Sequence, residues 1–78
     1  MINSVQVRMA RAALGWGVRD LAVYAGVTAN TVSRFENGAD ALGNTLRKIQ
    51  RALEDADIEF IEENGGGPGV RLKHRART

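Results

Sequence analysis

Cysteine is absent from the 78 residues of this chain, and histidine and proline each occur only once. Without cysteine, the chain has neither a disulfide framework nor a cysteine-based zinc site. The single histidine, His74, lies in a basic C-terminal stretch, so the sequence offers neither a catalytic triad nor a general base. We therefore expect no enzymatic activity, no catalytic residues, no metal site and no cofactor.

Long apolar runs are absent as well. No stretch approaches the length of a membrane span, and the N-terminus lacks a charged segment followed by an apolar run. We therefore expect a soluble, cytoplasmic protein with no membrane partner. A chain this short has a marginal core of its own, and dimerisation is the remaining obvious source of stability.

Charge is unevenly distributed along the chain, although the net charge is only +2. Residues 1–51 carry seven Lys or Arg against three Asp or Glu, residues 52–66 carry six acidic and no basic residues, and residues 67–78 carry four basic and no acidic residues. The basic first part is typical of a surface that faces phosphates. The alternative is an ordinary solvated surface.

The most informative stretch is residues 18–36. Apolar residues recur at helical spacing in each half, with Leu21 and Ala25 four apart and Val32 and Phe35 three apart. Gly26 separates the halves and can adopt a left-handed turn without steric cost, and Thr28 stands where a second helix needs an N-cap. The pattern predicts two short helices joined by a tight turn, a helix-turn-helix.

The residues of this stretch also resemble a known family. Leu21-Ala22, the run from Ala25 to Thr28 and the run from Thr31 to Gly38 are similar to the XRE-type helix-turn-helix proteins, the family of the phage Cro and cI repressors. The resemblance extends to Arg11–Trp16 before the motif and Thr45–Leu53 after it. It implies a small, all-helical, sequence-specific DNA-binding domain that usually works as a dimer at a palindromic operator. One departure is Gly17-Val18, where members usually carry Ser-Gln and where the glutamine commonly touches DNA.

Helical spacing outside the motif predicts further elements. We expect a first helix over residues 5–14, capped by Asn3 or Ser4, and motif helices over residues 17–25 and 29–36. A fourth helix is predicted over residues 45–56 with Asn44 as its N-cap. Leu42 is the one residue of the preceding loop that we expect to reach the core.

Strand-like alternation follows the fourth helix. Ile58 and Phe60 alternate with Glu59 and Ile61, and Val70 and Leu72 alternate with Arg71 and Lys73. A glycine-rich segment separates the two runs. We interpret these runs as a β-hairpin, with a frayed tail after residue 64 as the alternative. The glycine-rich segment lacks the Lys-Ser/Thr of a phosphate loop. The expected fold is mainly α. It consists of a four-helix Cro/cI-like (lambda-repressor-like) domain over residues 1–56, a hairpin extension over 57–73 that serves as a dimerisation element, and a basic disordered tail over 74–78.

Arg11 is an unusual residue for the apolar stripe of the first helix. The resemblance implies that it pairs with Glu36, and a buried guanidinium without a partner would be very costly. We expect a structural ion pair, with an Arg11 exposed to solvent or phosphate as the alternative.

The third helix is the expected recognition helix, because an α-helix fits the major groove and can read base edges there. Asn30 suits adenine and Arg34 suits guanine. The full set of expected DNA-contacting residues is Arg19, Thr28, Ala29, Asn30, Thr31, Ser33, Arg34, Asn44, Thr45 and Arg47. The expected dimerisation residues are Ile58, Phe60, Ile61, Val70 and Leu72.

These observations together predict a transcriptional regulator of bacterial or phage type, most simply a homodimeric repressor bound to double-stranded DNA at the nucleoid. The alternative is an antitoxin-like helix-turn-helix protein that regulates by holding a protein partner.

Overall fold

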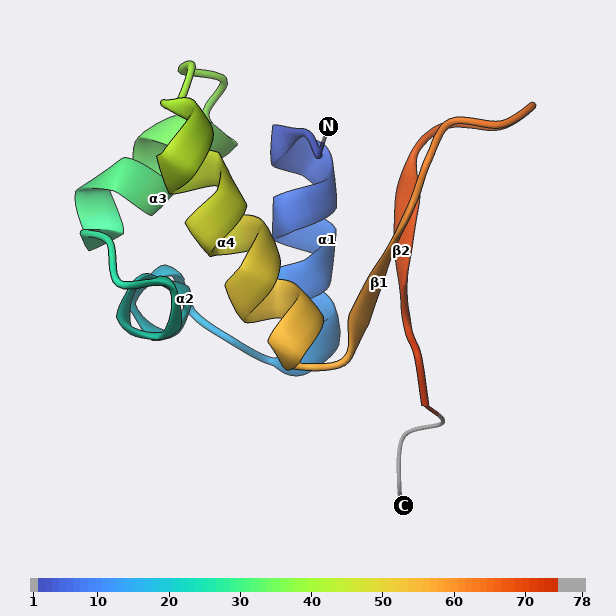
Figure 1. The fold of residues 1–78 in the computed structure, drawn as a ribbon, viewed down its shortest axis with the longest axis horizontal. Coiled ribbons are helices and arrows are strands. Elements are labelled where there is room, and N and C mark those ends of the chain that lie inside the picture. The colour runs from blue at the N-terminus through green and yellow to red at the C-terminus, as the bar shows by residue number, and fades with distance from the viewer. Residues whose placement is uncertain (1, 75–78) are drawn as a thin grey trace.

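The computed structural model describes residues 2–74, which form four helices and one antiparallel hairpin. The elements are α1 (Ser4–Leu14), α2 (Val18–Ala25), α3 (Ala29–Glu36), α4 (Gly43–Asp55), β1 (Ile58–Ile61) and β2 (Gly69–Leu72). In Figure 1, α2 and α3 lie on one side of α1 and α4, and the hairpin lies on the other. The expectation of a mainly α, four-helix fold with a small C-terminal hairpin is confirmed. The expected tail over residues 74–78 lies outside the described residues except for His74.

Local sequence chemistry explains where α1 begins and ends. The Asn3 side chain accepts a hydrogen bond from the Gln6 amide at 2.9 Å, and the Gln6 side chain accepts one from the Asn3 amide at 2.9 Å. This reciprocal pair satisfies two amides that a helix start otherwise leaves free. Gly15 ends the helix in the left-handed region, with φ of 69°. The helix therefore starts at Ser4, one residue before the expected position.

The start of α4 differs from the expectation. Asn44 was predicted to cap this helix, but Asn44 lies within its first turn, and Leu42 holds the N-cap position without a side-chain hydrogen bond. Leu42 was also predicted to reach the core, and its side chain is instead 77 % exposed. Both predictions were wrong because the helix begins two residues early. The core takes Leu46, one turn further on, in place of Leu42.

The core lies where α1, α2, α3, α4 and the start of β1 meet. Its largest fully buried side chains come from every helix and from the first strand, and they are Leu21, Ile49, Leu53, Ile58, Val7 and Val32. Burying each of these side chains contributes roughly 1.5–3 kcal/mol relative to exposure. The hairpin is thus continuous with the core of the helical domain.

The hairpin is joined to the helices by polar contacts as well. Gln6 is 3 % exposed, and its Nε2 donates to the carbonyl of Ile61 at 3.2 Å and to that of Gly69 at 3.0 Å, one from each strand. The strands pair in register, with Glu59 opposite Arg71, and an ion pair of 2.8 Å joins these two side chains. One buried amide on α1 therefore holds both strands against the helix.

The other end of the hairpin is closed around Asp57, which has a positive φ of 81°. Its carbonyl accepts from the Lys73 amide at 2.8 Å, and its carboxylate accepts from the His74 amide at 3.1 Å. The same carboxylate lies 2.6 Å from the His74 Nδ1. These bonds hold the end of β2 beside the junction between α4 and β1.

Candidate nucleic-acid interface

The two motif helices pack against each other around a left-handed turn. Gly26 ends α2 with φ of 72°, which favours glycine because a side chain would strain this conformation. Thr28 then caps α3, since its Oγ1 accepts from the Thr31 amide at 3.1 Å. Leu21 and Val32 point into the core from the two helices and are fully buried. The opposite face of α3 is consequently turned toward solvent.

The outward face of α3 is centred on Asn30 and Arg34. Both are exposed and lie four residues apart, hence one above the other on the same side of the helix. Neither side chain takes part in a hydrogen bond or ion pair formed among residues 2–74. An amide and a guanidinium with all their donors unused form a polar face that can read base edges.

The other α3 residues expected to contact DNA differ in how far they are exposed. Thr28 is exposed, Thr31 and Ser33 are half-buried, and the Thr28 and Thr31 hydroxyls lie 2.8 Å apart in a mutual hydrogen bond. Ala29 is partly buried and packs against the core, so its methyl group is less available than the sequence suggested. Asn37 follows Arg34 by three residues and is exposed on the continuation of the same face. Asn37 was not among the residues expected to contact DNA, although its spacing from Arg34 was a usable signal.

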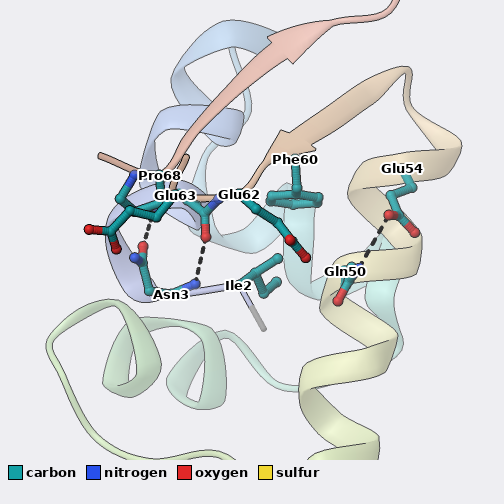
Figure 2. A pocket seen from close by; sticks show the side chains of 9 residues that line it. Ile2, Asn3, Gln50, Glu54, Phe60, Glu62, Glu63 and Pro68 are labelled. Carbon is teal, nitrogen blue, oxygen red and sulfur yellow. Dashed lines mark hydrogen bonds between the residues drawn. The ribbon is translucent and has the colours of Figure 1, made fainter. Parts of the chain in front are cut away.

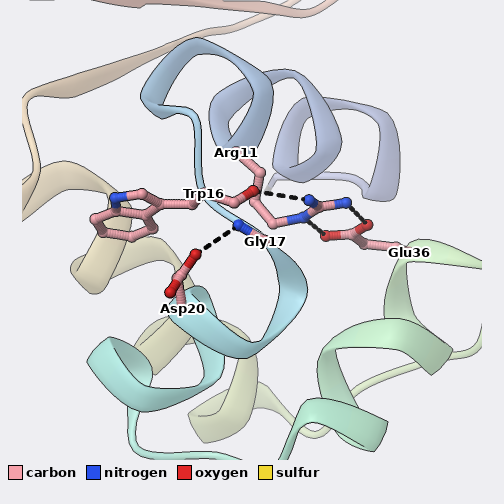
Figure 3. Close-up of polar contacts among 5 residues, drawn as sticks. All are labelled: Arg11, Trp16, Gly17, Asp20 and Glu36. Carbon is pink, nitrogen blue, oxygen red and sulfur yellow. Dashed lines mark hydrogen bonds and ion pairs between the residues drawn. The ribbon is translucent and has the colours of Figure 1, made fainter.

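The start of α2 contains Gly17-Val18, where the sequence departs from the usual Ser-Gln of the family. Gly17 is the N-cap, and the Asp20 Oδ2 accepts from the Gly17 amide at 2.7 Å (Figure 3). Val18 is half-buried against the core, and Arg19 is exposed. The Asp20 carboxylate therefore occupies the helix end that a phosphate would approach, and Arg19 is the cation left to offset it.

The start of α4 is a second helix end at the surface. No side chain caps its first turn, so its backbone amides keep their capacity to donate. Asn44 and Arg47 are exposed, Thr45 is half-buried, and the Arg47 guanidinium lies close to Gly43, where an added Cβ would be 3.6 Å from its Nη1. A cation thus lies beside uncapped amides, which together favour an anion.

An ion pair fixes α3 to α1. Arg11 Nε and Nη2 donate to the two carboxylate oxygens of Glu36 at 2.6 and 2.7 Å, and Arg11 Nη1 donates to the Trp16 carbonyl at 3.0 Å (Figure 3). The two side chains are 20 % and 6 % exposed. The hydrogen bonds that Arg11 donates to Glu36 raise the pKa of Arg11, against the opposing effect of burial. Every buried side-chain nitrogen and oxygen atom of the pair therefore has a hydrogen-bond partner. The bidentate contact holds the last turn of α3 against α1.

The residues expected to form a dimer interface differ in how deeply they are buried. Ile58 is fully buried in the core, so its side chain offers no surface to a second chain, contrary to the expectation. Burial of the first strand residue follows from its position directly after α4, where the chain turns onto the helices. Phe60, Ile61, Val70 and Leu72 are half-buried and retain some accessible area.

Two features are absent from residues 2–74. No helix in this part of the chain has the length and apolar character that a membrane span requires. No group of three or more His, Asp or Glu side chains in the same part is arranged to hold a metal ion.

Comparison with known proteins agrees with this geometry. The sequence profile of the Helix-turn-helix family matches residues 7–61, which contain all four helices except the first residues of α1, together with β1. A protein of Archaeoglobus fulgidus that carries the provisional name of an HTH-type transcriptional regulatory protein is 34 % identical over 61 residues. The match covers 78 % of this chain and 20 % of that relative's length. The chain therefore belongs to the XRE, or Cro/cI, type of helix-turn-helix DNA-binding domains, a family of regulators rather than enzymes.

Proposed function

We propose that this chain is a sequence-specific transcriptional regulator that acts as a homodimeric repressor at a palindromic operator. The observation that carries the proposal is the outward face of α3, where Asn30 and Arg34 lie exposed with no partner among residues 2–74. Polar side chains that bind nothing within their own domain, on a helix held rigidly by the core, suit recognition of an external polar surface.

The proposed base contacts follow from side-chain chemistry. With α3 in the major groove, the Arg34 guanidinium can donate two hydrogen bonds to the O6 and N7 atoms of a guanine. The Asn30 amide can pair with the N6 and N7 atoms of an adenine. Ser33 and Thr31 lie beside this stripe and offer hydroxyls to neighbouring base edges or phosphates, and Asn37 extends it by one turn.

Backbone contacts would come from the elements on either side of α3. The uncapped amides at the start of α4, with Asn44, Thr45 and Arg47, form one proposed phosphate site. Arg19 on α2 and Thr28 at the start of α3 form another. These contacts set the orientation of α3 without reading sequence, which is the usual division of labour in protein–DNA interfaces.

A homodimer would present two α3 helices to the DNA. Two copies related by a two-fold axis place their α3 helices in successive major grooves, about 34 Å apart on one face of the duplex. A chain whose core is this small also gains stability from a partner. Such a repressor would work in the cytoplasm at the nucleoid.

The proposal is tested by selecting bound sequences from random duplex DNA and measuring affinity across a range of salt concentrations. We expect an enriched site with two-fold symmetry and a steep loss of affinity as salt rises, since phosphate contacts release counterions. Enrichment of a single unpaired half-site would refute the dimeric operator. Absence of any enrichment would refute sequence-specific binding by this chain.

A second candidate function is suggested by the outer face of α2. Val23 and Tyr24 are 78 % and 65 % exposed, and the Tyr24 ring stacks on Trp16 with centroids 4.5 Å apart. Exposed apolar side chains of this kind suit a protein partner, as in an antitoxin-like regulator. The test is whether a second polypeptide co-purifies with the wild-type chain and with the Val23→Glu variant. A polypeptide that binds wild type and not Val23→Glu would support this function, and one that binds both equally would count against it.

A further inference from the structure

A groove of about 590 Å³, lined by no residue of α3, lies between the start of α1, the end of α4 and the hairpin. Figure 2 shows its apolar floor, where the Phe60 ring lies near Ile2. Gln50 and Glu54 line it from α4, and Glu62 and Glu63 line it from the segment that follows β1. The groove therefore combines an apolar surface with three carboxylates.

The charge of the groove is not balanced from within the described part of the chain. No Lys or Arg lines it, and none of the ion pairs formed among residues 2–74 includes Glu54, Glu62 or Glu63. The contact made by Glu54 is a hydrogen bond from the neutral Gln50 amide at 3.2 Å. An acidic rim over an apolar floor suits a segment that carries positive charge on long, partly apolar side chains.

The chain itself contains such a segment, which begins at the opposite end of the hairpin. Residues 73–77 read Lys-His-Arg-Ala-Arg, with a basic residue at every second position from Lys73. The amides of Lys73 and His74 are bonded to Asp57, at the junction between α4 and β1. β2 runs from the end of the hairpin beside Glu62 and Glu63 toward this junction, so the chain moves away from these two carboxylates of its own groove as it approaches Lys73 (Figure 1).

We propose that the acidic groove of one copy binds residues 73–77 of a second copy. The inference rests on the proposed homodimer and names the surfaces that form it. Arginine and lysine stems would cover the half-buried Phe60 ring while their charged ends meet Glu54, Glu62 and Glu63. Under two-fold symmetry the contact occurs twice, because each copy supplies one groove and one basic segment.

The test uses two charge-reversed forms of the full chain. Glu62→Lys/Glu63→Lys makes the groove basic, and Arg75→Glu/Arg77→Glu makes the segment acidic. Each variant alone sets like charges against each other in both contacts of its homodimer. A mixture of the two variants is different, because the heterodimer has a basic groove facing an acidic segment in one contact and the original pairing in the other.

We expect sedimentation to show homodimers of either variant at least about tenfold weaker than wild type, and a heterodimer within about threefold of wild type, on the scale that like-charge contacts produce at interfaces. The control is Asp40→Lys, a reversal of an exposed charge in the loop before α4, which should leave the dimer unchanged. Far-UV circular dichroism should show all variants folded, since Glu62 and Glu63 are exposed.

Other results would overturn the inference. If wild type dimerises and both variants dimerise equally well, the dimer stands and the groove is not its interface. If mixing fails to restore association, the groove and the segment do not meet between copies. If Arg75→Glu/Arg77→Glu weakens DNA binding alone and leaves the dimer intact, the segment contacts DNA instead. If wild type is a monomer at every concentration, the proposed homodimer fails together with the inference, while DNA selection still tests recognition by α3.

Discussion

Replacing Glu36 with alanine should destabilise the fold far more than an average substitution. The change removes both carboxylate acceptors of Arg11 and leaves its guanidinium with only the Trp16 carbonyl. Removing one partner of a buried pair typically costs 3–5 kcal/mol, and the 20 % exposure of Arg11 places this case near the lower end, at about 3 kcal/mol. In a domain of this size, that loss lowers the melting temperature by roughly 12–24 °C.

Thermal unfolding followed by circular dichroism measures the effect, and two matched variants isolate its cause. Arg11→Met/Glu36→Leu removes both charges and should recover much of the lost stability, because the cost comes from the unpaired ion. Glu59→Ala removes a carboxylate from the exposed pair with Arg71 and should leave the melting temperature close to that of wild type. A Glu36→Ala protein that melts within a degree or two of wild type would refute the reasoning.

Three further predictions concern the hairpin and the recognition helix. Gln6→Ala leaves two hairpin carbonyls without their donor and should cost about 2 kcal/mol, with hydrogen exchange accelerated in both strands; unchanged exchange would contradict the anchoring role. The hydrogen bond from Arg71 holds the pKa of Glu59 below its ordinary value of 4.5, so the pair stabilises the hairpin fully above about pH 4.5 and loses this contribution as the pH falls through the lowered pKa. An NMR titration should show the Glu59 midpoint rising in Arg71→Gln, and an unshifted midpoint would contradict the pairing. Arg34→Ala should cost about 1–3 kcal/mol at the selected operator and relax preference at one base pair; a variant that binds all sequences equally more weakly would indicate a phosphate contact instead.

Short-range features of the chain were readable from the sequence. The turn at Gly26, the cap at Thr28 and the extent of α3 depend on residues within one helical turn of each other, so spacing and side-chain chemistry predicted them directly. The alternation around Phe60 and Val70 predicted the two strands in the same way. The outward positions of Asn30 and Arg34 followed once the buried stripe of α3 was recognised.

What the sequence alone determined was therefore the set of elements and the chemistry that each one carries. Only the tertiary structure decided which of these side chains meet, because burial depends on segments distant in sequence. It placed Leu42 in solvent, Ile58 in the core and Gln6 between two strands more than fifty residues away. It also assembled the acidic groove, whose residues come from the start of α1, the end of α4 and the hairpin. No sequence pattern links these three segments. Local pattern reveals what a residue can do, and packing determines what it touches.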